Sequence, residues 1–289
     1  MAQPKEESVN VLVPRSAKAV FIRASALLPL ERSRCGRIAL AAMLAAVVLP
    51  GLPDTAHAAA SAPDAIAAAV ANPARPATDT QRDANRKPAA VLAFAGVKPG
   101  DKVADYAAGS GYFTRLFADI VGPQGHVYAS VPSPLLQYPN IVKGIAEIQG
   151  FVVTHANVNV NFAASLDAAR YPEKLDLFWI SQNYHDLKDP FMGPVDMAAF
   201  NRAVLAALKP GGIYVVLDHV AAAGSPADVT DTLHRIEPSV VRREVETAGF
   251  EFVGESKLLA NPDDPHTAGP FDKTIQGRTD QFIYKFRKP

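Results

Sequence analysis

The most constraining feature of this sequence is a short apolar segment that runs directly into a glycine-rich turn and then into a helical pattern. Residues Lys102–Ala107 have the pattern of a buried strand, Ala108–Gly111 contain two glycines, and apolar residues recur at helical spacing from Phe113 to Val121. Strands that alternate with helices in this way are joined by crossover connections, which link parallel strands. The segment therefore predicts an α/β fold whose ligand site lies at this turn.

The same alternation continues along the rest of the chain. We expect further strands at His126–Val131, within Phe151–Val160, and at Leu175–Ser181, Ile213–His219, Phe250–Ser256 and Gln281–Phe286. Helices are expected at Pro88–Ala95, over a stretch with Phe200, Val204 and Leu208 on one face, and from Pro238 to Gly249. This pattern predicts a doubly wound, mostly parallel sheet that is covered by helices on both faces, in a single domain.

The N-terminal stretch has the composition of a targeting signal. Arg32, Arg34 and Arg37 precede an apolar run, Ile38–Pro53, and a small-x-small motif ends at Ala58. The run is short and interrupted by prolines, so we expect no stable membrane span. Cleavage near Ala58 would give a periplasmic or secreted protein. An uncut membrane anchor, or a cytoplasmic protein if export fails, remains the alternative.

The chain divides into three predicted segments. Residues 1–58 are a prefix with the signal peptide, residues 59–77 an Ala/Pro-rich linker, and residues 78–289 the α/β domain, which opens with a polar helical stretch at Thr78–Lys87. Basic and acidic residues both number 29, so the formal net charge is zero and we expect no nucleic-acid partner. The only cysteine, Cys35, lies in the prefix, so the mature chain would have no disulfide or thiolate metal site.

The turn after the first strand carries a recognisable motif. An acidic residue precedes the glycines in the order Val103-Ala-Asp105-Tyr-Ala107-Ala-Gly109-Ser-Gly111-Tyr112, and Leu208-Lys-Pro-Gly-Gly212 precedes the fifth predicted strand. Both resemble motifs of the class I S-adenosylmethionine-dependent methyltransferases, whose Rossmann-like sheet has seven strands. Three further segments look like an exported subgroup of predicted bacterial methyltransferases: Asn183-Tyr-His-Asp186, Glu246–Phe250 and Thr279–Phe282. The resemblance covers roughly Pro88 to the C-terminus.

The resemblance implies S-adenosylmethionine as cofactor and a set of residues that bind it. Asp105 would orient the methionyl end through its amino group, and the two glycines would let the loop pass beneath the cofactor. Two departures stand out: Ala107 replaces the family's first glycine, which is tolerable at negative φ, and no acidic residue ends the second strand to take the ribose hydroxyls. The expected cofactor-binding residues are Asp105, Ala107, Gly109, Ser110, Gly111, Tyr112, Ser130 and Asn183.

The exit of the fourth predicted strand contains the candidate catalytic residues Tyr184, His185 and Asp186. Methyl transfer is an in-line displacement, and a base assists it when the acceptor carries a proton. We expect His185 to be that base, Asp186 to orient it, and Tyr184 to line the acceptor site. Alternatively, these residues simply cap the following helix. Side chains that could also reach the site are His219, which is the second candidate base, and His234, His266, Asp263 and Asp264 in later connections.

The sequence thus predicts a methyltransferase that acts on an unidentified small-molecule or cell-envelope acceptor, with no prediction of the oligomeric state. The alternative is a non-catalytic protein on the same fold that binds a nucleoside-type ligand. A nicotinamide-dependent oxidoreductase would require a small residue at the position of Thr114 and an acidic residue at the end of the second strand. Both are missing, so the sequence does not favour this activity. No metal site is expected, since no two histidines have ligand spacing on one helix. An oxygen-ligand site that uses Asp186, Asp218 or Asp263 stays open.

Overall fold

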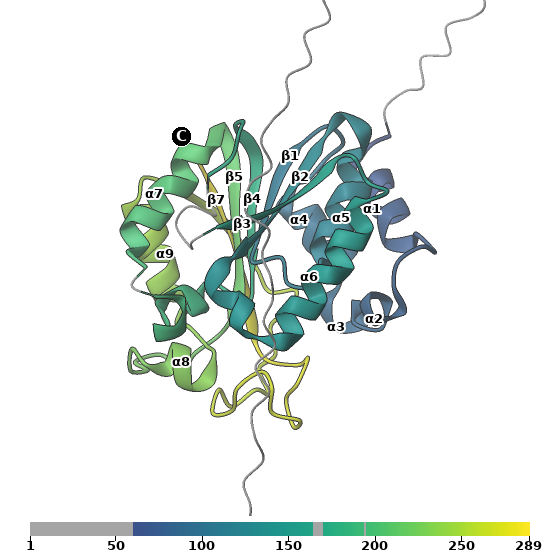
Figure 1. Ribbon diagram of the computed structural model, residues 1–289. Helices are drawn as coiled ribbons and strands as arrows, with labels where there is room; N and C mark the ends of the chain where they lie inside the picture. The colour runs from purple at the N-terminus through teal and green to yellow at the C-terminus, as the bar shows by residue number, and fades with distance from the viewer. Residues whose placement is uncertain (1–59, 164–169, 194) are drawn as a thin grey trace, which may run out of the picture. The chain divides into compact units, whose positions relative to one another are not determined.

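The computed structural model describes residues 60–163, 170–193 and 195–289, which are built around a seven-stranded sheet (Figure 1). The strand order is β3-β2-β1-β4-β5-β7-β6, and β7 alone runs in the opposite direction to the other six strands. The strands are β1 (Lys102–Tyr106), β2 (His126–Pro132), β3 (Val158–Ala163), β4 (Leu175–Ser181), β5 (Leu208–His219), β6 (Glu251–Ser256) and β7 (Gln281–Arg287). Strand order reverses between β1 and β4, so the predicted seven-stranded, mostly parallel, doubly wound fold is confirmed.

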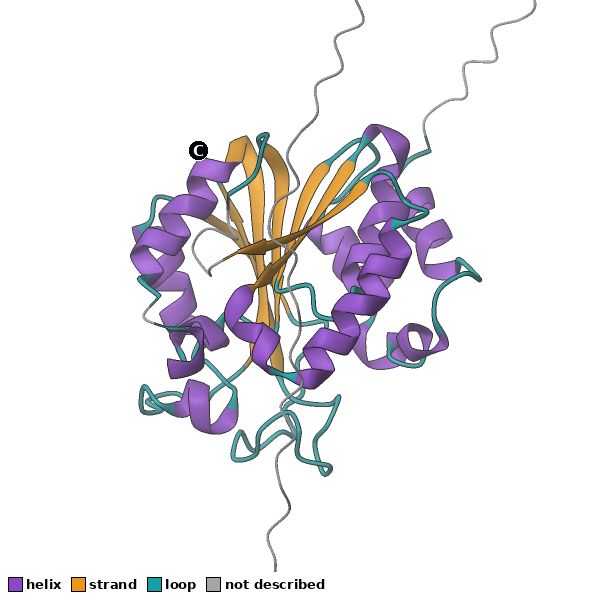
Figure 2. Ribbon diagram, viewed as in Figure 1, coloured by secondary structure: helices purple, strands orange, loops and turns teal. Residues whose placement is uncertain are grey.

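Helices cover both faces of the sheet (Figure 2). The α-helices are α1 (Ala62–Ala71), α2 (Ala77–Thr80), α3 (Asp83–Arg86), α4 (Pro88–Ala95), α5 (Tyr112–Val121), α6 (Pro139–Val152), α7 (Met197–Ala207), α8 (Val229–Leu233) and α9 (Pro238–Thr247). Alternate strand residues enter two cores: Trp179 and its neighbours pack against α1, α4 and α5, whereas Phe178 packs against α7 and α9. The lone tryptophan is therefore a core residue.

The third and fifth strands differ from their predicted positions. The third strand was expected within Phe151–Val160 but lies at Val158–Ala163, because Phe151 and Val152 complete helix α6. These two apolar residues lie a helical turn after the buried Ile148 and pack against the core, which satisfies them without a strand. Leu208 belongs to β5 rather than to the preceding helix, since it pairs with Leu175 of β4.

The segment predicted as a linker at residues 59–77 largely forms helix α1, so this expectation does not hold for Ala62–Ala71. Ser61 caps the helix, and Ile66 and Ala69 are buried against the core beside α4 and α5. Alanine is the best helix former, which explains why an Ala-rich stretch folds once two of its residues find apolar partners. The predicted polar helical stretch consists of the short helices α2 and α3. The expected signal peptide lies outside the described residues.

Among the described residues, no helix combines the length and the apolar character that a membrane crossing requires.

Helix α6 lies against the glycine turn after β1 because glycines stand on both sides of the contact. A Cβ atom on Gly144 of α6 would lie 3.0 Å from Ser110 Cα, and one on Gly111 would lie 2.7 Å from Ile148 Cγ1. Both distances are at or below the limit that real Cβ atoms adopt. Gly144 therefore lets the helix approach the backbone of the turn at Ser110, and Gly111 leaves the space that the Ile148 side chain occupies.

We predict that Gly111→Ala destabilises the protein more than Gly109→Ala. Both glycines have positive φ, of 83° and 56°, so alanine costs about 1 kcal/mol at either position. Only at Gly111 does the new methyl group meet Ile148, and such overpacking costs about 1–3 kcal/mol more. The free energies of unfolding in urea measure both effects, and equal losses in the two variants would contradict the close contact with α6.

Candidate functional site

A cavity of about 710 Å³ opens at the carboxyl ends of β1, β4 and β5. Its volume lies within the range of small-molecule pockets, roughly 300–1,000 Å³. The structure brings most of the predicted site residues to this one cavity. Those that line it are Asp105, Ala107, Gly109, Ser110 and Tyr112 from the turn after β1, and Asn183, His185 and Asp186 from the exit of β4.

Asp105 is a buried carboxylate at the end of β1, with only 3% of its surface exposed. The hydroxyl of Thr114, in the first turn of α5, donates a 2.6 Å hydrogen bond to Asp105 Oδ2. Burial raises the pKa of Asp105 to about 7, although the Thr114 hydrogen bond and the charge of Arg86 oppose this shift. A cation that enters the cavity beside Asp105 would therefore meet a poorly solvated acid.

Two arginines reach the cavity from the short N-terminal helices, and the sequence interpretation missed them as site residues. Arg86 donates a 3.0 Å hydrogen bond to Gln182 Oε1, and its guanidinium carbon lies 4.7 Å from the centre of the Tyr112 ring. Burial lowers the pKa of Arg86 to about 10. Arg82 lies over the same ring at 4.9 Å and pairs with Asp79. Their four-residue spacing on a helical stretch without an apolar face was the available signal.

The turn after β1 differs from expectation at Ala107, which has a φ of 57°. Alanine in place of the motif's first glycine was expected to be tolerable at negative φ. The left-handed conformation costs a residue with a Cβ atom about 1–2 kcal/mol. Gln182, at the exit of β4, also has a positive φ, of 62°, so strained residues lie on two sides of the same cavity.

Three predicted site residues do not line the cavity. Gly111 caps helix α5 and faces α6. Ser130 lies on the opposite face of the sheet from Asp105, and its hydroxyl is 3.1 Å from that of Tyr171. Tyr184 is fully buried, where its hydroxyl donates to Glu244 and accepts from Asn201, so it is a packing residue and not part of the acceptor site.

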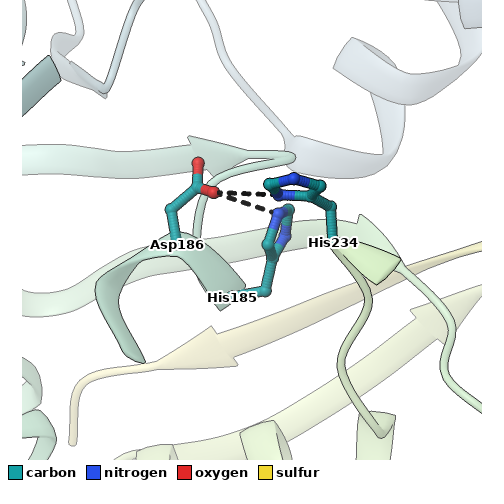
Figure 3. Close-up of side chains that lie close together, drawn as sticks. All are labelled: His185, Asp186 and His234. Atoms are coloured by element: carbon teal, nitrogen blue, oxygen red, sulfur yellow. Dashed lines mark ion pairs between the residues drawn. The ribbon is translucent and has the colours of Figure 1, made fainter. Parts of the chain in front are cut away.

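A cluster of charged and polar side chains forms the wall at the exit of β4 (Figure 3). His185 Nε2 lies 3.1 Å from Asp186 Oδ1, and Nδ1 of His234 lies 3.7 Å from the same oxygen. On its other side, His185 Nδ1 is 2.8 Å from Asp218 Oδ1, at the end of β5. Asn183 Nδ2 donates a 2.6 Å hydrogen bond to Asp186 Oδ2. Each polar atom of His185 and Asp186 therefore has a partner.

The charges of this wall set the protonation of its histidines. Burial alone would lower the pKa of His185, but the Asp218 and Asp186 carboxylates outweigh it and raise this pKa to about 10. The same contacts hold the pKa of Asp186 below its ordinary value, against the effect of burial. Burial lowers the pKa of His219 to about 4. His185 is thus an imidazolium at neutral pH, which does not favour its expected role as a base, whereas the second candidate, His219, is neutral.

Only some of the remaining predicted residues line the cavity. His234 and His219 line the cavity, whereas His266 pairs with Asp280 at 3.0 Å outside it. Asp264 does not line the cavity either, because it is buried and pairs with the fully buried Arg235 at 2.9 Å. This ion pair fixes the loop between β6 and β7, which brings Phe271 to the cavity. Asp263 is exposed and does not line the cavity.

One polar atom in the cavity wall has no partner among the described residues. Ser181 Oγ, at the last residue of β4, is buried and makes no hydrogen bond there. A buried hydroxyl without a partner is unfavourable by about 1–3 kcal/mol, so this atom is suited to contact a ligand. Sequence reasoning missed it because serine is common at strand ends.

We predict that the ligand-free protein loses stability as pH rises from 6.5 to 10. The pKa of His185 in the folded state, about 10, exceeds its ordinary value of 6.5. The contribution of protonated His185 to the free energy of unfolding is therefore complete below pH 6.5, and it is lost as the pH rises through 10. One proton corresponds to a slope of at most about 1.4 kcal/mol per pH unit. Urea unfolding at several pH values should show that the free energy of unfolding changes less steeply with pH in the His185→Gln variant than in the wild type. Nuclear magnetic resonance provides a second check: titration of the His185 ring near pH 6.5 would contradict the assignment.

No protein-family model matches this chain. Two curated relatives are ubiquinone/menaquinone biosynthesis C-methyltransferases UbiE. The protein of Ectopseudomonas mendocina (strain ymp) is 32% identical over 150 residues, which are 49% of this chain and 51% of the relative. That of Teredinibacter turnerae (strain ATCC 39867 / T7901) is 31% identical over 130 residues, 44% and 46% of the two chains. The chain thus spans about half the length of the curated relatives it matches.

A solved structure shows the same fold. A chain in the complex between the Haloferax volcanii Trm112 methyltransferase activator and the putative methyltransferase aligns with a TM-score of 0.50 and 16% identity. The alignment covers 78% of this chain and 98% of that one. The single-domain fold is therefore the Rossmann-like fold of class I methyltransferases. The sequence relatives add a similarity to C-methyltransferases over about half of this chain.

Proposed function

We propose that this protein transfers a methyl group from S-adenosylmethionine to a small molecule with an apolar body. One observation carries the proposal: the acidic turn after β1 and the charged exit of β4 line the same cavity. In a doubly wound sheet, this is the edge at which ligands bind. The match to C-methyltransferases over about half their length supports the reaction class.

The cavity offers complementary charges for the amino-acid end of this cofactor. Asp105 would bind the ammonium group, and Arg86 with Arg82 would bind the carboxylate. Charge-assisted hydrogen bonds of this kind are roughly twice as strong as neutral ones. Gly109 leaves open space above the turn, since nothing lies within 4 Å of the position of its missing Cβ. Ser181 Oγ supplies one further contact.

The ribose would be bound differently from the expectation at the end of β2. Val131 is fully buried and Ser130 faces Tyr171, so neither presents a polar group to the cavity. Two polar side chains line it instead: Tyr138, which precedes α6, and Asn140, in the first turn of α6. When bound, the cofactor supplies an electrophilic methyl group, and the chain's own task is to hold the acceptor in line and keep water out.

The acceptor would bind against apolar side chains at the mouth of the cavity. Phe271 is 72% exposed there, and the rings of Tyr138 and Phe191 lie edge to face at 5.5 Å. Exposed aromatic residues around a polar floor favour a ligand with an apolar or aromatic body and a polar reacting end. The relatives' names, which refer to ubiquinone and menaquinone biosynthesis, are in keeping with such an acceptor. An apolar component of the cell envelope would also fit.

We predict that Asp105→Asn weakens the binding of S-adenosylmethionine and S-adenosylhomocysteine by about ten- to a hundredfold. This range corresponds to the loss of one charged hydrogen bond, about 1.5–3 kcal/mol. Because the pKa of Asp105 is about 7, the wild-type affinity should fall about tenfold relative to the variant between pH 8 and pH 6, as the carboxylate takes up a proton. Calorimetric titration measures both effects.

Asp101→Asn is the matched control, since Asp101 is a buried acid just before β1 and does not line the cavity. Its affinity for the cofactor should equal that of the wild type. If the wild type binds neither compound at millimolar concentration, the proposal fails. Binding without transfer to any apolar acceptor would identify a non-catalytic binding protein instead.

We also propose that the protein is exported and belongs to an exported subgroup of its family. The basic, apolar and small residues that end at Ala58 support a cleaved signal, and the first described helix begins at Ala62. Cleavage after Ala58 would therefore leave every described helix and strand intact. N-terminal sequencing of the protein from its native host should find Ala59 as the first residue, and a retained Met1 would contradict export.

A further inference from the structure

We propose that His185, Asp186 and His234 form a binding site for a divalent first-row transition-metal ion. Two imidazoles and one carboxylate are a common donor set for such ions, and this set leaves coordination positions open. The three residues come from two places in the chain, the exit of β4 and the end of α8, and meet at the cavity (Figure 3). This inference departs from the sequence interpretation, in which no metal site was expected.

The distances between the donor atoms suit a single ion. The three donors lie within 4.8 Å of one another, and the two contacts to Asp186 Oδ1 measure 3.1 and 3.7 Å. Donors that hold one ion at about 2.0–2.2 Å in tetrahedral geometry lie about 3.4 Å apart. Small side-chain rotations would therefore bring the three donors onto an ion.

A second set of contacts orients these donors, as is usual around bound metal ions. Asp218 is fully buried and lies 2.8 Å from His185 Nδ1, which leaves Nε2 of this ring directed at the site. Asn183 donates to Asp186 Oδ2, which leaves Oδ1 to face the histidines. Arg235 follows His234 and is fixed by hydrogen bonds to Val220 O and Ala268 O, so the third ligand comes from an anchored backbone.

Two buried carboxylates lie beside the proposed donors. Asp186 supplies one donor atom, and Asp218 lies 2.8 Å from the ring of His185. Buried carboxylates are unfavourable without a partner of opposite charge, and a divalent cation at this place would be such a partner.

The site deepens the proposed function and, in this part, rests on it. The ligand atoms line the same cavity as the turn that would hold the methyl donor, so the open positions of the ion face the acceptor. An acceptor with an oxygen that can bind a metal ion would be held by that oxygen at the polar floor, with its apolar body against Phe271. The acceptor class is thus narrowed to oxygen-bearing molecules such as phenols or enols.

Metal retention by the full-length chain tests the site. The protein, stripped with a chelator and dialysed against Zn²⁺ without cofactor, should retain about one ion per chain by elemental analysis. The variants His234→Ala and Asp186→Asn should retain only a background amount of Zn²⁺. His234 is 31% exposed in its side chain, so its replacement should leave the fold intact. His126→Ala is the matched control, since His126 lies at the amino end of β2, and it should retain the ion.

A wild type that retains no Zn²⁺, or a His234→Ala variant that retains as much as the wild type, would overturn the site. With Co²⁺ in place of Zn²⁺, acetohydroxamate, which binds through oxygen, should alter the visible spectrum of the wild type. An unchanged spectrum would contradict the proposal that the bound ion keeps open coordination positions. Because these measurements contain no S-adenosylmethionine, their failure is distinguishable from failure of cofactor binding, which calorimetry reports separately.

Discussion

The buried carboxylate of Asp218 is the contact on which the wall at the exit of β4 depends. It is the second-last residue of β5, and it accepts hydrogen bonds from the backbone N–H groups of His185, at 2.9 Å, and His219, at 2.8 Å. It also contacts the His185 ring. A fully buried carboxylate without such partners would be strongly unfavourable. The chain after β4 is therefore fixed to the end of β5, and the positions of Asn183 and Asp186 follow from it.

The cavity contains two charged groups of residues that differ in their protonation. Beside β1, burial raises the pKa of Asp105 into the neutral range, and the nearby Arg86 partly offsets this. Beside β4, His185 lies between two carboxylates, which raises its pKa to about 10. Each group thus has its own counterions, and the two groups can bind different ligands or different parts of one ligand. This division suits a reaction in which a cationic donor and a neutral acceptor must lie side by side.

Much of the fold could be predicted from the sequence, because the signals were local. The glycine turn between Lys102–Tyr106 and the helix that follows, and the alternation of strands and helices after it, depend on residues close together in the chain. Helix α1 was missed because its stability comes from burying Ile66 against distant helices rather than from a local pattern. The left-handed conformation of Ala107 likewise reflects its surroundings and not its own preference.

The site could be predicted only in part, because the side on which a strand residue faces depends on register. Ser130 pairs with Tyr106 and so faces away from Asp105, although it stands at the expected end of β2. Tyr184 and His185 are neighbours in sequence, yet one enters the core and the other the cavity.

His234 joins the cluster from 48 residues beyond Asp186, a distance at which no spacing rule applies. For the same reason, a search for histidine pairs on one helix did not find the proposed metal site. Its ligands become neighbours only when the ends of β4 and β5 and the turn after α8 meet at one edge of the sheet. A divalent ion would lie between His185 Nε2 and Asp186 Oδ1, next to the ring that Asp218 orients, and it could also bind an acceptor.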